Sequence, residues 1–75
     1  MPKLCRVSGQ ETIRALERLG FVQVRQRGSH AVLKKQTPEG EIGCVVPLHR
    51  ELAIATLRGV LKQAKVTPDE FMENL

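Results

Sequence analysis

Aromatic residues are nearly absent from this chain, which has two phenylalanines and neither tryptophan nor tyrosine. Proteins that hold single-stranded nucleic acids stack the bases on aromatic side chains, so this mode of binding lacks its usual platform here. Long apolar runs are missing too, because no stretch approaches the roughly 18 residues that a membrane-spanning helix needs. The composition therefore argues against both a membrane span and an aromatic nucleic-acid groove.

Cysteines and acidic residues are sparse, and neither kind is grouped. Cys5 and Cys44 stand in no metal-binding or redox spacing, and no signal peptide is recognisable, which points to the reducing cytoplasm. Glu39, Glu41 and Glu51 are scattered along the chain and form no ligand cluster. The sequence therefore predicts neither a bound metal nor a small-molecule cofactor.

Positive charge is what the chain has in excess. It carries 12 Lys and Arg against 8 Asp and Glu, with a sequence pI near 9.6. Three of the acids lie in the last ten residues, so residues 1–65 carry 12 cations against 5 acids, a net charge of +7. A concentrated positive charge favours a nucleic acid or another polyanion as the partner.

Capping signals and apolar spacing predict the helices. Ser8 and Glu11 form a capping box, and Gly20 is placed to end the helix that they begin. A second helix is indicated by apolar residues that recur at steps of three and four: Ile54, Leu57, Leu61 and Ala64. Gly59 within it would allow a close approach to a sheet.

A short terminal helix is predicted by a second capping box. Thr67 and Glu70 form this box, with Pro68 at the first helical position. We expect Phe71 and Leu75 on this helix to cover the core.

Three strands are predicted between the long helices, over residues 21–26, 30–36 and 42–47. Gly28 and Ser29 read as a two-residue hairpin loop, which places Arg27 opposite His30. The same register gives one face for the core and one polar face. The core face would carry Val22, Val24, Ala31 and Leu33; the polar face would carry Gln23, Arg25, Arg27, His30, Val32 and Lys34.

The order of elements predicts one α+β domain over residues 1–75, of the type α-β-β-β-α. Its three-stranded antiparallel sheet would hold both long helices on one face and leave the other face open. This order is that of the double-stranded-RNA-binding domain, which reads duplex shape through basic side chains. The comparison is one of fold and does not by itself assign a function.

The hairpin and its polar face are the candidate site. Histidine is the side chain best suited to general acid or base catalysis near neutral pH, and His30 is the candidate for that role. The predicted RNA-binding residues surround it: Arg25, Arg27, Gly28, Ser29, Lys34 and Lys35. Because the third strand runs back along the second, Pro47 should end near His30, and His49 could reach the same site as an acid or a phosphate ligand. A structural histidine at a strand end is the other interpretation of His49, and an ordinary solvated face is the other interpretation of the basic surface.

Several segments of the sequence resemble the HicA toxin family. They are Gly20-Phe21, Arg27-Gly28-Ser29-His30, Val46-Pro47-Leu48-His49, the run from Thr56 to Ala64, and Glu70-Phe71. The chain departs from the family pattern at Ala55 and Lys65, where glycines are usual.

The resemblance implies a toxin of a type II toxin–antitoxin system. Such toxins have a double-stranded-RNA-binding-like fold, cleave mRNA without a metal, and are inhibited by a HicB-type antitoxin. The catalytic histidine of the family's Gly-Ser-His motif corresponds to His30. Two other classes stay open from the residues alone: a non-catalytic RNA-binding module that uses the same face, and a protein-interaction domain whose charge only confers solubility.

Overall fold

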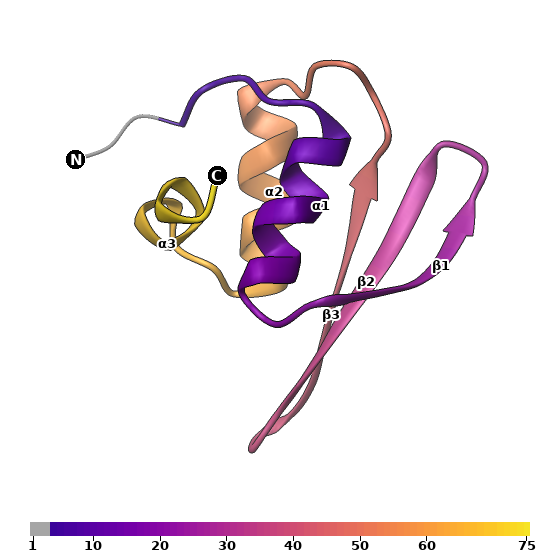
Figure 1. Ribbon diagram of the computed structural model, residues 1–75, viewed down its shortest axis with the longest axis vertical. Coiled ribbons are helices and arrows are strands. Elements are labelled where there is room, and N and C mark those ends of the chain that lie inside the picture. Colours follow the sequence, from indigo (N-terminus) through magenta and orange to yellow (C-terminus); the bar gives the residue numbers. More distant parts are fainter. Residues whose placement is uncertain (1–3) are drawn as a thin grey trace.

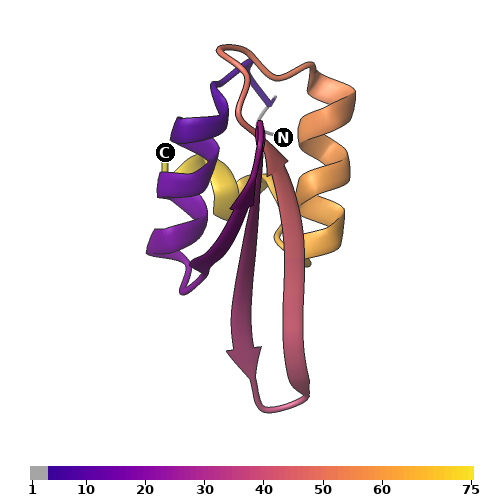
Figure 2. The ribbon, with the colours of Figure 1, turned by 90° about the vertical axis from the view of Figure 1, so that its right-hand side faces the viewer.

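The computed structural model describes residues 4–75 and has the predicted α+β architecture (Figure 1). The elements in chain order are α1 (Gly9–Arg18), β1 (Val22–Arg27), β2 (His30–Thr37), β3 (Gly40–Pro47), α2 (Ile54–Ala64) and α3 (Pro68–Glu73). The strands form one antiparallel sheet in the order β1-β2-β3, and α1 and α2 both lie behind it (Figure 2). The fold prediction is confirmed, and residues 1–3 of the predicted domain lie outside the described part. No helix within residues 4–75 is long and apolar enough to cross a lipid bilayer.

Helix α1 begins and ends where its capping residues predict. The Ser8 hydroxyl accepts a hydrogen bond from the Glu11 N–H at 3.0 Å, and the Glu11 carboxylate accepts one from the Ser8 N–H at 2.9 Å. The hydrogen bond from the Ser8 backbone lowers the pKa of Glu11 and keeps this acceptor charged. At the other end Gly20 has φ 103°, and the Phe21 N–H donates to the Leu16 carbonyl at 3.0 Å. This is the predicted Schellman-type end.

The core lies between the sheet and the helices. Its largest fully buried side chains come from every layer: Leu16, Leu33, Val46, Leu52, Leu57 and Phe71. Cys44 belongs to this cluster, and burial raises the pKa of its thiol to about 11. Cys44 therefore acts as a small apolar side chain at neutral pH, whereas Cys5 is exposed.

Helix α3 confirms one half of the prediction for the C-terminus. Thr67 and Glu70 form the expected capping box, and Phe71 is fully buried. Leu75 is 42% exposed, so the expectation that it covers the core is wrong. In a longer helix Leu75 would lie on the same face as Phe71, four residues before it. The helix ends at Glu73, so Leu75 lies beyond the helix and does not share that face.

Helix α2 has the predicted bounds, but Gly59 does not have the predicted role. The helix packs on the core through Leu57, Val60, Leu61 and Ala64. Gly59 is exposed, and a Cβ added to it would have no atom within 4 Å. The expected close approach to the sheet at Gly59 is therefore wrong.

Replacing Gly59 with alanine is expected to raise the free energy of unfolding by about 0.5–1 kcal/mol. Alanine restricts the unfolded backbone and meets no neighbour in the folded helix. Urea unfolding followed by circular dichroism at 222 nm measures the change. A lower urea midpoint for Gly59→Ala would show that this face of α2 packs against something.

The sheet keeps the predicted register near the hairpin and loses it further along β1. The pairs Arg27↔His30, Gln26↔Ala31 and Arg25↔Val32 are as predicted. Beyond them Leu33 pairs with Gln23 rather than Val24, because a bulge lies between Gln23 and Arg25. One extra residue in a strand moves the residues beyond it to the opposite face.

The bulge overturns two of the predicted core positions. Val22 is 61% exposed and Val24 is 54% exposed. The expectation that these two valines contribute to the core is therefore wrong. The exposed Gln23 is the residue that pairs with Leu33, on the helix side. Ala31 and Leu33 of β2 are buried as predicted.

Candidate nucleic-acid interface

His30 stands at the first position of β2, where the hairpin turns. Its imidazole is exposed, and its neighbours across the sheet are Arg27 on β1 and Pro47 on β3. Gly28 in the loop has φ 56°, the left-handed conformation that the turn prediction required. The predicted juxtapositions of His30 with Arg27 and of His30 with the end of β3 are both confirmed.

Backbone hydrogen bonds join the hairpin loop to the start of α1 through the segment that follows β3. The Leu48 N–H donates to the Ser29 carbonyl at 2.6 Å, and the Gly9 N–H donates to the His49 carbonyl at 2.9 Å. Gly9 packs so closely there that a Cβ would collide with the Pro47 carbonyl oxygen and lie 2.9 Å from Leu48 Cα. These contacts form a rigid corner, which consists of the hairpin loop, the segment from Pro47 to His49 and the start of α1. The site is therefore built on this corner rather than on a free loop.

His49 is part of this corner through its backbone carbonyl. Its side chain is exposed, as is that of His30. Within residues 4–75, neither imidazole takes part in a side-chain hydrogen bond. The interpretation of His49 as a hydrogen-bonded structural histidine therefore gains no support from its side chain. What holds His49 in place is its carbonyl, which accepts the hydrogen bond from α1.

The arginines of β1 lie on the open face together with His30. Arg25 pairs with Val32 and Arg27 pairs with His30, and paired residues share a face of the sheet. Among the described residues, neither arginine is part of an ion pair. Both guanidiniums are available to an anionic ligand.

The two predicted lysines are in different situations. Lys34 lies on the open face, but its ammonium is 3.2 Å from a carboxylate oxygen of Glu41. Lys35 is the next residue of the strand and points to the helix side, where its ammonium lies 5.9 Å from the centroid of the Phe21 ring. The structure therefore brings Lys34 to the same face as His30 and places Lys35 on the opposite one.

A shallow depression of about 280 Å³ on the open face was not foreseen. It is lined by Val24, Arg25, Val32 and Lys34. The bulge in β1 creates it by turning Val24 outward. No glycine or proline in β1 marks the bulge, so no residue type in the strand could have predicted it.

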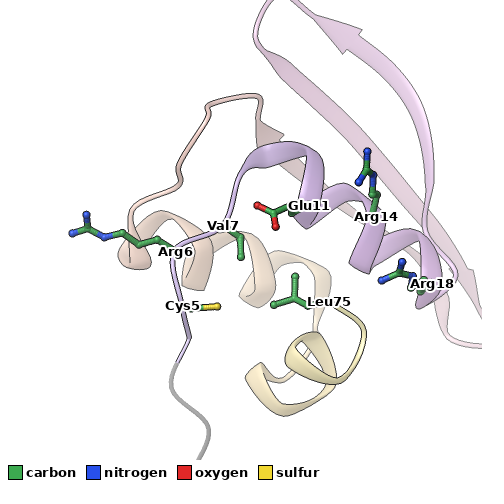
Figure 3. Close-up of a pocket in the computed structure, with 7 residues that line it drawn as sticks. All are labelled: Cys5, Arg6, Val7, Glu11, Arg14, Arg18 and Leu75. Atoms are coloured by element: carbon green, nitrogen blue, oxygen red, sulfur yellow. The ribbon is translucent and has the colours of Figure 1, made fainter.

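Another cavity, of about 300 Å³, lies away from the sheet, between the N-terminal segment, α1 and the C-terminus (Figure 3). Two of its arginines are engaged in the structure: Arg6 pairs with Glu51 at 3.6 Å, and Arg18 donates to the Asn74 carbonyl at 2.6 Å. Figure 3 shows Arg6 and Arg14 directed away from each other.

The described residues contain no group of three or more His, Cys, Asp or Glu side chains placed to hold a metal ion. Sheet, helices and open basic face together define a protein of the double-stranded-RNA-binding-domain type.

Residues 9–66 match the model of a family described as HicA toxin of bacterial toxin-antitoxin. The match covers more than half of the chain, which therefore belongs to the HicA toxin family, as its motifs predicted. Its role is that of a toxin in a toxin–antitoxin system, and such a system implies an antitoxin partner. No curated protein matches the chain.

Proposed function

We propose that this toxin is an endoribonuclease that cleaves mRNA without a metal, with His30 as general acid or base. The observation that carries the proposal is the exposed His30 imidazole opposite Arg27, with Arg25 further along the same strand. A titratable group next to free guanidiniums on an open surface suits the cleavage of an anionic polymer.

The chemistry needs no metal because RNA carries its own nucleophile. The 2′-hydroxyl oxygen attacks the adjacent phosphorus, the bond to the 5′-oxygen breaks, and a 2′,3′-cyclic phosphate and a 5′-hydroxyl are formed. One group must accept the proton of the 2′-hydroxyl, and another must protonate the departing 5′-oxygen. His30 can serve in either step, and Arg27 and Arg25 would stabilise the negative charge on the phosphate.

Ser29 and Gly28 complete the proposed RNA contact at the turn. The Ser29 carbonyl accepts the Leu48 N–H, and within residues 4–75 the Ser29 hydroxyl makes no hydrogen bond, so it can donate to a phosphate oxygen. Lys34 would add charge further along the face.

The proposed inhibitor is a HicB-type antitoxin that covers the same face. Arg25 and Arg27 form no ion pair within residues 4–75, and a partner with carboxylates opposite them would be attracted to the face that carries His30 and would exclude RNA. Binding of one acidic protein would thereby block both substrate contact and catalysis.

RNA cleavage in the presence of EDTA tests the proposal. We expect the purified chain to degrade a labelled mRNA equally well with and without the chelator, and to leave 2′,3′-cyclic phosphate ends. Activity only with an added divalent metal would contradict the mechanism. Binding of RNA with no cleavage under either condition would favour the second candidate, a non-catalytic RNA-binding module on the same face.

We also propose His49 as the second proton-transfer or phosphate-binding group. Its carbonyl is fixed to α1 two residues beyond Pro47, the cross-strand partner of His30. We expect His49→Ala to lower the cleavage rate by about tenfold or more, within the range of general acid–base catalysis. Single-turnover cleavage measures this, and full activity of His49→Ala would leave His30 as the only histidine required.

A further inference from the structure

An apolar strip crosses the open face of the sheet next to the cationic residues. It consists of Val22, Val24, Val32 and Val45, which we call the valine strip. Val45 is 40% exposed, Val22 and Val24 are more than half exposed, and Val32 is half-buried between them. Val32 pairs with Val45 on one side, and Val24 and Val32 line the same depression on the other. The strip therefore extends over all three strands.

The open face of a two-layer fold is expected to be polar, because it meets water. Adjacent exposed aliphatic side chains, rimmed by charged ones, mark contact surfaces for other molecules. The backbone of RNA offers phosphates and hydroxyls, which gain nothing from valine side chains. The strip is therefore not explained by the phosphate contacts that are proposed for the substrate.

We propose that the valine strip is the apolar anchor on which the antitoxin docks. The inference deepens the proposed function, since it rests on an antitoxin that covers the face carrying His30. A side chain of the antitoxin would enter the depression between Val24 and Val32, and acidic groups around it would meet Arg25. The partner surface is thus a protein with an apolar centre and carboxylates at its rim.

Charge and hydrogen bonding favour this occupant over others. A second copy of the chain would bring its own Arg25 and Arg27 toward those of the first, and like charges repel. Addition of a strand at the β3 edge is hindered, because the Gln63 side chain already accepts the Val45 N–H at 3.2 Å. A partner that approaches the face rather than this edge avoids both obstacles.

Two binding determinants would then share one surface. RNA would depend on the arginines and not on the valines, whereas the antitoxin would depend on both. Changing the valines alone should therefore separate inhibition from substrate binding.

The test is the double variant Val24→Thr with Val45→Thr. Threonine keeps the branched shape and the strand preference of valine, removes a methyl group from the contact, and leaves the charge unchanged. Leu75→Thr is the matched control, since Leu75 is a comparably exposed apolar residue outside the sheet. The probe is the purified cognate antitoxin, titrated by calorimetry against each toxin carrying the His30→Ala change to prevent toxicity.

We expect the double variant to bind the antitoxin about 10- to 100-fold more weakly, and the Leu75→Thr control to bind within about twofold of the parent. RNA affinity, measured by fluorescence anisotropy, should be the same for all three. Unchanged antitoxin affinity would overturn the proposal, and an equal loss of RNA affinity would assign the strip to RNA. A parent protein that sediments as a dimer and a double variant that sediments as a monomer would assign the strip to self-association.

Failure of this proposal can be told apart from failure of the nuclease proposal. Antitoxin binding does not require RNA cleavage, so the titrations are informative even if the chain proves inactive on RNA. Conversely, cleavage in EDTA would stand if the valines proved irrelevant to the antitoxin.

Discussion

His30→Ala is expected to lower the rate of RNA cleavage by about 10²- to 10⁴-fold. The substitution removes the proposed proton-transfer group from the reaction and takes nothing from the core, because the side chain is exposed. Arg25 and Arg27 stay in place, so RNA affinity should change little. Single-turnover cleavage of a labelled RNA, with the dissociation constant measured in parallel, gives the two quantities separately.

Gln36→Ala is a suitable control for this experiment. Gln36 is exposed on the same strand as His30 and pairs with Glu41 at the far end of β2. We expect this variant to cleave at the parental rate. If His30→Ala also retained that rate, the catalytic role of His30 would be refuted, and if both variants lost RNA binding, the loss would reflect damage to the sheet.

Local signals predicted the elements that are held by local interactions. The capping boxes at Ser8 and Thr67 concern hydrogen bonds over three residues, and both are present. The Gly28-Ser29 turn fixes the pairing of Arg27 with His30 in the same way, because a two-residue loop leaves one register. The position of His30 beside the end of β3 followed from the strand order, because β3 runs back antiparallel along β2.

The bulge in β1 could not be predicted by the same reasoning. Alternation from Val22 to Val24 suits a regular strand, and only the tertiary pairing of Leu33 with Gln23 shows that a residue is inserted. The error is informative about function. Had Val22 and Val24 been buried, Val32 and Val45 would be the apolar residues left on the open face, and no apolar strip would reach β1.

Gly9 is the other feature that sequence reasoning did not foresee. As the first residue of α1 it looks replaceable, because alanine is the better helix former. Its importance comes from residues nearly forty positions later in the chain, where Pro47 and Leu48 pass directly over its Cα. Such a contact between distant segments leaves no local pattern.

Gly9→Ala is expected to lower the free energy of unfolding by about 3 kcal/mol. The added methyl group would collide with the Pro47 carbonyl oxygen, which is backbone and cannot rotate away. A domain of this size has a total stability of about 4–11 kcal/mol, so the loss is a large part of it. Urea unfolding followed by circular dichroism measures the effect.

Gly59→Ala provides the matched control, since the same methyl group is added to a helix where it meets no atom. The two substitutions should shift the urea midpoint in opposite directions. A stable Gly9→Ala protein would mean that the segment after β3 can move away from α1. Because this movement would break the hydrogen bond from Gly9 to His49 and displace the end of β3 from His30, RNA cleavage should then fall even though the protein stays folded. Full stability together with full cleavage would show that the corner does not position the site.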